Sequence, residues 1–430
     1  MRTTRARTTA QREPRRWRTP PPLTRGAESL EGMDILREVG GEAGVLLWQS
    51  YRNVMFWATV EGDERAKLFS PAASRKRMAD VTAARLPHDL VEPLSAIGGM
   101  LGAPTTTAGE VVAEACGTIA LWAGEERHPA VTLAFSQAAA LAAPRNALLA
   151  LRVGRVARDL GEPARAETWL RHAIMISRQV GDWDTYAQAY MSLGNMAIKR
   201  GSFPMANRMH TKALRASRRK GLPALQGQAA HNLFVVMTEM GRYPQAEEYA
   251  KTAFRAYGPD DALIPRLAHD VAYLWMEQGH FARALEVFQA LRPRVTTTAG
   301  ERVTIVANIA RAAGGVGDRE EFRRAWVEIN RLAKDADSRP TLPYGMLELA
   351  RGAAALGEWD RAEQAAEQSI ALAKELRQAK IMMSAETFLD AVRNDRKLQH
   401  PSAAASTESA PEADAFAANL VRTLEMSASH

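Results

Sequence analysis

The stretch YMSLGNMAIKRGSFPMANRMHTKA, residues 190–213, decides the fold of this chain because it holds two helices and the turn between them. Gly194 lies in the first helix, where a small residue lets a second helix approach closely. Gly201 marks the turn, since glycine adopts positive φ without strain. Phe203 and Ala206 then open a second amphipathic segment. The stretch therefore predicts one pair of closely packed antiparallel helices.

The same turn recurs along most of the chain. Successive turn glycines are separated by 37, 40, 40, 38, 38 and 40 residues, and small and aromatic residues keep the same phase after them. A fixed period of this length is typical of stacked helical pairs. The glycines are Gly124, Gly161, Gly201, Gly241, Gly279, Gly317 and Gly357.

This pattern resembles the tetratricopeptide repeat. Tyr190, Leu193 and Gly194 match its first helix, and Phe203 and Ala213 match its second. The spacing exceeds the family's usual length of about 34 residues and is similar to the variant repeats of peptide-sensing bacterial regulators. The resemblance covers about residues 108–395, and the repeat domain is expected over residues 105–395. It implies an all-α, right-handed solenoid of about seven helical pairs that binds a protein or peptide as an adaptor or regulator, without naming the ligand.

Composition supports helices and argues against catalysis. The chain has 430 residues, 46% apolar and 7% aromatic, which is too long for one compact core. Its one cysteine, Cys116, excludes an intramolecular disulfide and is expected to be buried. No zinc-protease, nucleophile-elbow, phosphate-loop or dinucleotide motif occurs, and the nine histidines do not cluster. We therefore expect no catalytic residue, cofactor or metal, and a cytoplasmic protein without membrane contact.

The positive charge is confined to the start of the chain. Residues 1–26 contain eight arginines and one acid, which accounts for the whole net charge of +7. Residues 1–27 are therefore expected to be a disordered arginine-rich leader, and nucleic-acid binding is not expected of the folded body. Arg15-Arg16 lacks the apolar segment of a twin-arginine signal. The leader remains open as an arm for nucleic acid or an acidic membrane, as a dispensable tail, or as a misassigned start with Met33 as the true beginning.

Residues 28–104 form helices that do not fit the repeat. Residues 45–60 are apolar on most faces and predict a buried helix, Ser70 begins another helix, and a further helix is expected after Pro93. The region is interpreted either as a cap covering the first repeat or as the output module of a transcriptional or phosphorelay regulator that senses a small peptide in the groove. An exposed patch of Trp48, Phe56 and Trp57 would favour the output module, and their burial would favour the cap.

The ligand surface is expected on the first helix of each pair, which lines the concave groove of tetratricopeptide repeats. Six and nine positions before each turn glycine, the sequence is rich in asparagine and arginine, which can hold a peptide backbone or a carboxylate. One further step back gives two histidines. The candidates are Arg152, Arg155, Asn195, His231, Asn232, His269, Asp270, Tyr273, Asn308, Arg311 and Arg351. A solvated polar face remains the alternative.

Two segments depart from the pattern. Gly314 and Gly315 precede the sixth turn glycine and predict a weakened helix end that forms a flexible joint. Residues 396–430 read as a flexible linker followed by a short amphipathic segment with Phe416, Leu420 and Leu424 on one stripe. We expect this segment to be an unstructured tail, with docking into the chain's own groove as the alternative. Homo-oligomerisation is left open.

Overall fold

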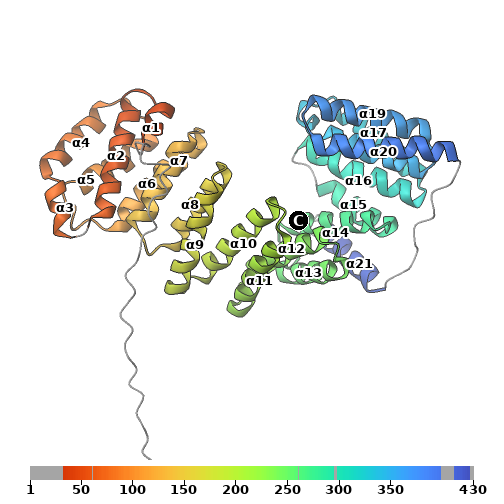
Figure 1. Cartoon of the computed structure of the whole chain (residues 1–430), viewed down its shortest axis with the longest axis horizontal. Coiled ribbons are helices and arrows are strands. Elements are labelled where there is room, and N and C mark those ends of the chain that lie inside the picture. Colours follow the sequence, from red (N-terminus) through yellow and green to blue (C-terminus); the bar gives the residue numbers. More distant parts are fainter. Residues whose placement is uncertain (1–31, 61, 260, 295–297, 399–410, 427–430) are drawn as a thin grey trace, which may run out of the picture. The chain divides into compact units, whose positions relative to one another are not determined.

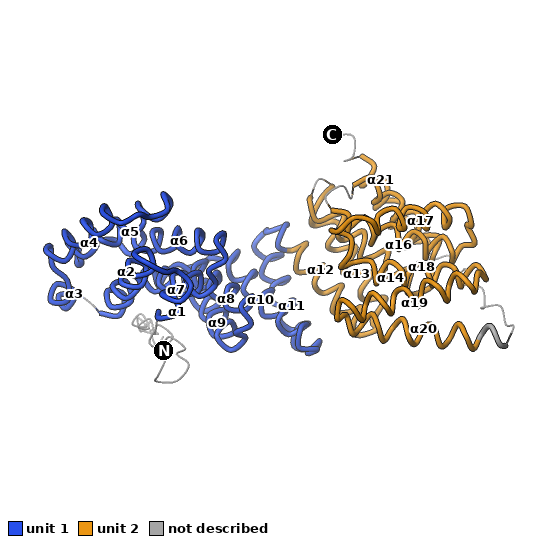
Figure 2. Tube along the Cα trace, turned by 90° about the horizontal axis from the view of Figure 1, so that it is seen from above, with its two compact units in different colours: residues 1–225 blue, residues 226–430 orange. Residues whose placement is uncertain are grey.

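The computed structural model describes residues 32–60, 62–259, 261–294, 298–398 and 411–426. Over these ranges the chain forms α-helices and two short 3-10 helices, and no strand (Figure 1). It divides into two compact units, residues 1–225 and 226–430 (Figure 2). The predicted leader, residues 1–27, and residues 399–410 of the predicted linker lie outside the described residues.

Among the described residues, seven helical pairs follow a block of five helices, as the repeat count predicts. The N-terminal block comprises α1 (Met33–Glu38), α2 (Gly41–Thr59), α3 (Asp63–Leu68), α4 (Pro71–Ala83) and α5 (His88–Met100). The pairs are α6 (Gly109–Glu125) with α7 (Pro129–Ala142), α8 (Ala147–Asp159) with α9 (Pro163–Val180), α10 (Trp183–Lys199) with α11 (Phe203–Lys220), α12 (Pro223–Glu239) with α13 (Tyr243–Tyr257), α14 (Ile264–Glu277) with α15 (Phe281–Leu291), α16 (Ala299–Val316) with α17 (Arg319–Leu332), and α18 (Leu342–Ala355) with α19 (Trp359–Glu375). The 3-10 helices are η1 (Arg292–Arg294) and η2 (Ala336–Ser338). The last two helices are α20 (Ala379–Leu398) and α21 (Pro411–Met426).

Six of the seven predicted turn glycines have positive φ, between 68° at Gly241 and 83° at Gly317. Gly124 is the exception, because it lies inside α6 and the left-handed position of that turn is taken by Arg127, with φ 61°. The glycine rhythm therefore locates the turns correctly from the second pair onward and places the first turn three residues early.

The N-terminal block shares a core with the first helical pair. The Tyr51 and Phe135 rings pack edge to face, 6.0 Å apart. The carboxylate of Glu38 accepts the backbone N–H groups of Ala130, at 2.8 and 2.9 Å, and of Val131, at 3.0 Å. These donors begin α7 and have no partner within the helix, so Glu38 caps it and meets the positive end of its dipole.

The three aromatic residues of α2 do not form one exposed patch. Trp57 is buried and donates its indole N–H to the Pro104 carbonyl at 2.7 Å. Trp48 is half-buried, whereas Phe56 is 49% exposed. The predicted cap at Ser70 is confirmed, since its hydroxyl accepts the Ala73 N–H.

The helix expected after Pro93 instead begins at His88 and contains Pro93. Its buried face starts before the proline, at Leu90, and continues through Leu94. Pro93 lacks the N–H that would bond to the Asp89 carbonyl, but its ring is buried on the same apolar face and the helix continues through it.

The glycines of α16 allow close packing and do not form a joint. A Cβ on Gly314 would lie 2.3 Å from the Gly352 carbonyl oxygen, and one on Gly315 would lie 2.2 Å from the Phe281 ring. The helix continues through both residues to Val316. The prediction of a weakened helix end is wrong, because contacts on two sides hold the glycines in the helix.

Replacing Gly314 with alanine should destabilise the protein by about 2 kcal/mol, because the added methyl group overpacks the contact between α16 and α18. The matched control is Gly117→Ala in α6, where a Cβ would meet nothing within 4 Å. That variant should gain about 0.5–1 kcal/mol from helix propensity. Urea unfolding measures both, and equal shifts of the two midpoints would contradict the packing argument.

His210 of α11 lies buried against Gly194 of α10. A Cβ on Gly194 would lie 2.4 Å from the His210 Nε2 atom. Neither ring nitrogen has a hydrogen-bond partner among the described residues. Burial lowers the pKa of His210 to about 4, so the imidazole is neutral in the folded protein at pH 7.

Acid should therefore destabilise the chain through His210. Its folded-state pKa lies below the unfolded value, so as pH falls from about 6.5 to about 4 the unfolded chain binds the proton first. The free energy of unfolding should fall over this window, by about 3 kcal/mol at most. His210→Phe keeps a flat ring but cannot titrate, so its urea midpoint should fall less between pH 7 and pH 4.5. If the urea midpoints of the two proteins fell equally between pH 7 and pH 4.5, His210 would not be the source of the acid destabilisation.

The C-terminal segment is a packed helix, so the expectation of an unstructured tail is wrong for residues 411–426. In α21 the predicted stripe of Phe416, Leu420 and Leu424 is buried. The Phe416 ring packs edge to face on Phe254 of α13, at 5.7 Å, and on Trp275 of α14, at 6.0 Å. The helix also contacts α15, whose Arg283 donates to Asp414, so it lies beside the two second helices α13 and α15.

Candidate ligand-binding surface

The first helices of unit 2 carry a continuous chain of hydrogen-bonded side chains, with one link from each pair to the next. His231 Nε2 lies 2.9 Å from Asp270 Oδ2, and His269 Nδ1 lies 3.1 Å from Asp270 Oδ1. His269 Nε2 lies 3.2 Å from Asn308 Nδ2, and the Tyr344 hydroxyl donates to Asn308 Oδ1 at 2.6 Å. The chain joins α12, α14, α16 and α18.

These contacts have a single consistent direction. The Tyr344 hydroxyl fixes the orientation of the Asn308 amide, whose N–H then donates to His269 Nε2. His269 must in turn donate from Nδ1 to Asp270, and His231 donates to the other carboxylate oxygen. The hydrogen-bond pattern therefore requires every donated proton to point along the chain toward Asp270.

Asp270 is the acceptor at the centre of this chain. Burial favours its neutral form, but hydrogen bonds from His231 and His269 outweigh burial and hold the pKa of Asp270 below its ordinary value. Its side chain is nevertheless 28% exposed, and the His269 side chain is 27% exposed. A charged acceptor held rigidly by two imidazoles is therefore accessible on this face.

A second cluster follows on α16 and α18. The buried carboxylate of Glu348 accepts from Arg311 at 3.0 Å and from Arg351 at 2.7 Å, and Arg311 also donates to Glu277 at 2.6 Å. Arg351 keeps 27% of its side chain exposed. Tyr273 stacks on His269, with ring centroids 6.5 Å apart, and burial raises its pKa to about 12.

The predicted residues thus have different surroundings. Asn308 is fully buried with both ends of its amide used, so it supports its neighbours and offers no surface to a ligand, against the sequence expectation. Asn232 is half-buried on α12. In unit 1, Arg152 is exposed, Asn195 is half-buried, and Arg155 donates to Gln188 at 2.7 Å.

The sequence reasoning missed Tyr257 and Tyr344. Tyr344 lies one helical turn before Glu348 on the same face of α18, so continuing the count back from Gly357 would have found it. Tyr257, whose hydroxyl lies 3.4 Å from His231 Nδ1, belongs to a second helix and gives no signal in that count.

Tyr344→Phe should cost about 1–3 kcal/mol, because it leaves the buried Asn308 carbonyl oxygen without its donor. The same substitution at Tyr243, which is 41% exposed, should change stability by less than about 0.5 kcal/mol. Urea unfolding of both variants compares the two sites. Equal midpoints would show that the Asn308 contact contributes nothing.

The helical pairs, their turn glycines and the close contacts between paired helices define the chain as a tetratricopeptide-type all-α solenoid. No protein-family model matches the sequence, and no relative is found among curated proteins.

Solved structures of similar architecture include the apo form of RapI, at 13% identity over 62% of this chain and 99% of that chain, with a TM-score of 0.49. A tetratricopeptide repeat protein from Parabacteroides merdae is 14% identical over 65% of this chain and 98% of its own, with a TM-score of 0.42. A Rap protein complexed with competence and sporulation factor is 13% identical over 84% of this chain and 99% of its own, with a TM-score of 0.35. At these values the likeness does not extend to function.

Within the described ranges, no helix is long and apolar enough to cross a bilayer. The same residues contain no group of three or more His, Cys, Asp or Glu side chains arranged to hold a metal ion.

Proposed function

We propose that this chain is a non-enzymatic adaptor or regulator that binds a peptide or an extended protein segment along the first helices of unit 2. The observation that carries the proposal is the chain of hydrogen bonds from His231 to Tyr344, which fixes polar side chains on four successive first helices. A surface ordered before binding loses little side-chain entropy when the ligand arrives, which favours affinity.

The exposed groups indicate the chemistry of the ligand. Asp270 can accept backbone N–H groups or a cation, and the free donors of Arg351 can hold a carboxylate. The two residues lie on α14 and α18, with α16 between them. At least two interhelix spacings of about 8–10 Å each therefore separate them, the length of about five or six extended residues. A short peptide with a carboxylate at one end fits this spacing.

A second candidate function uses the N-terminal block as an output surface. Phe56 and Leu68 are exposed, at 49% and 53%, beside a cavity of about 430 Å³ that Lys76 and Arg77 also line. This observation favours partner binding at α2–α4, although Trp57 is buried and cannot contribute.

Selection of a random phage-displayed peptide library on the full chain tests both candidates. Peptides bound by the first helices should bind Tyr273→Ala and Arg351→Ala at least tenfold more weakly, because both side chains are partly exposed on this surface. Binding would be measured by fluorescence anisotropy with each synthetic peptide.

Arg324→Ala, on the second helix α17, is the matched control and should leave affinity unchanged. Peptides that lose affinity only on Phe56→Ala would instead support the N-terminal surface. If every selected peptide binds Tyr273→Ala and Arg351→Ala as tightly as the original chain, the proposal for the first helices fails.

A further inference from the structure

In unit 2, α21 lies in a groove between second helices, and this groove is called the seat of α21. Its contacts show which kind of helix such a groove can bind. The apolar stripe of α21 is buried between α13 and α15, over the end of α14. At the rim, Asp414 accepts from Arg283 at 2.6 and 2.9 Å, and Lys251 lies 3.4 Å from Glu412. The occupant is thus a helix with acids in its first turn followed by an aromatic and aliphatic stripe.

Unit 1 contains the equivalent groove, between α9 and α11 over the end of α10. Positions correspond when counted from the turn glycines Gly161 and Gly201 in unit 1 and Gly241 and Gly279 in unit 2. Arg171 then matches Lys251, Ile174 matches Phe254, Ala197 matches Trp275, and Met205 matches Arg283. A cavity of about 480 Å³ is lined by all four of these unit 1 residues.

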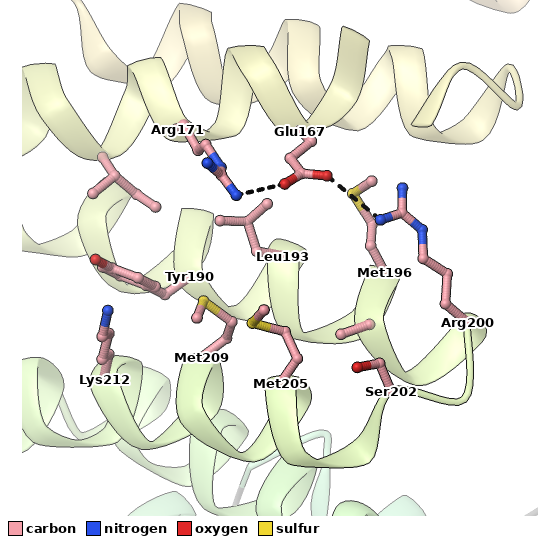
Figure 3. A pocket seen from close by; sticks show the side chains of 12 residues that line it. Glu167, Arg171, Tyr190, Leu193, Met196, Arg200, Ser202, Met205, Met209 and Lys212 are labelled. Atoms are coloured by element: carbon pink, nitrogen blue, oxygen red, sulfur yellow. Dashed lines mark hydrogen bonds and ion pairs between the residues drawn. The ribbon is translucent and has the colours of Figure 1, made fainter. Parts of the chain in front are cut away.

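The lining of this cavity has the chemistry of a helix-docking groove. Figure 3 shows Leu193 of α10 and Met205 and Met209 of α11 lying together opposite α9. Met205 is 38% exposed. Flexible methionines on an exposed surface adapt to apolar side chains of varied shape. The floor is therefore apolar and accessible.

The rim supplies the charge. Arg171, Arg200 and Lys212 line the cavity against one carboxylate, Glu167, which pairs with Arg171 at 2.6 Å and with Arg200 at 3.4 Å. The lining therefore carries two more positive than negative groups, as suits a helix that begins with acids. By contrast, α21 has three acids and one arginine.

We propose that the groove between α9 and α11 binds an amphipathic helix of a partner protein, with acidic residues in its first turn and aromatic and aliphatic residues at i, i+4 and i+8. The chain's own α21 occupies the corresponding seat in unit 2, so the unit 1 groove takes its helix from outside. This site is separate from the first-helix surface and does not depend on the function proposed for it.

The test uses a labelled synthetic peptide with the sequence of residues 411–426 as the probe and the full chain as the receptor. The peptide should bind, and Met205→Asp should weaken binding at least tenfold. Met175→Asp is the matched control, since Met175 is 39% exposed on α9 and does not line the cavity. A peptide with Phe416 replaced by alanine should also bind at least tenfold more weakly.

Several results would overturn the proposal. One is the absence of binding, and another is equal binding by a scrambled peptide. A third is binding that survives Met205→Asp but is changed by Arg283→Glu, which would place the peptide in the seat of α21. A dimer of the full chain that sedimentation detects and Met205→Asp dissociates would assign the groove to a second copy and overturn the partner assignment.

Discussion

Close approach between helices is the constraint on which the repeats of this chain depend. At Gly154 an added Cβ would lie 2.7 Å from the Leu170 side chain, and at Gly194 it would lie 2.4 Å from the His210 ring. In each case a residue of the second helix fills the space left by the missing side chain of the first. Within a unit, pairs that are packed alike place equivalent residues of successive first helices on one face.

The sequence predicts the architecture well because the constraint is local and periodic. A glycine with positive φ and a small residue at the helix contact can both be recognised within one repeat, as at Gly201 and Gly194. Gly314 and Gly315 show where the same reasoning fails. Their composition alone indicates a weak helix end, whereas their actual role depends on Gly352 and Phe281, which are distant in sequence.

The sequence predicts which residues share the face of the candidate surface, but it does not predict the hydrogen bonds that join them. Counting back from the turns finds His269, Asp270 and Arg351, which are partly exposed. The same count finds Asn308, whose burial follows from contacts with His269 and Tyr344 that no periodicity encodes. The stripe of α21 is likewise visible in the sequence, but its seat depends on Arg283 and Trp275, far earlier in the chain.

The contact of Glu38 with the start of α7 has a consequence for how the chain is completed during synthesis. The carboxylate and the N–H groups that it caps are separated by 92 and 93 residues. The N-terminal block therefore cannot reach its final hydrogen bonding until the first repeat has left the ribosome. In an engineered array of these repeats, the block and the α6–α7 pair would have to be kept together as one module, because Glu38 of the block caps α7.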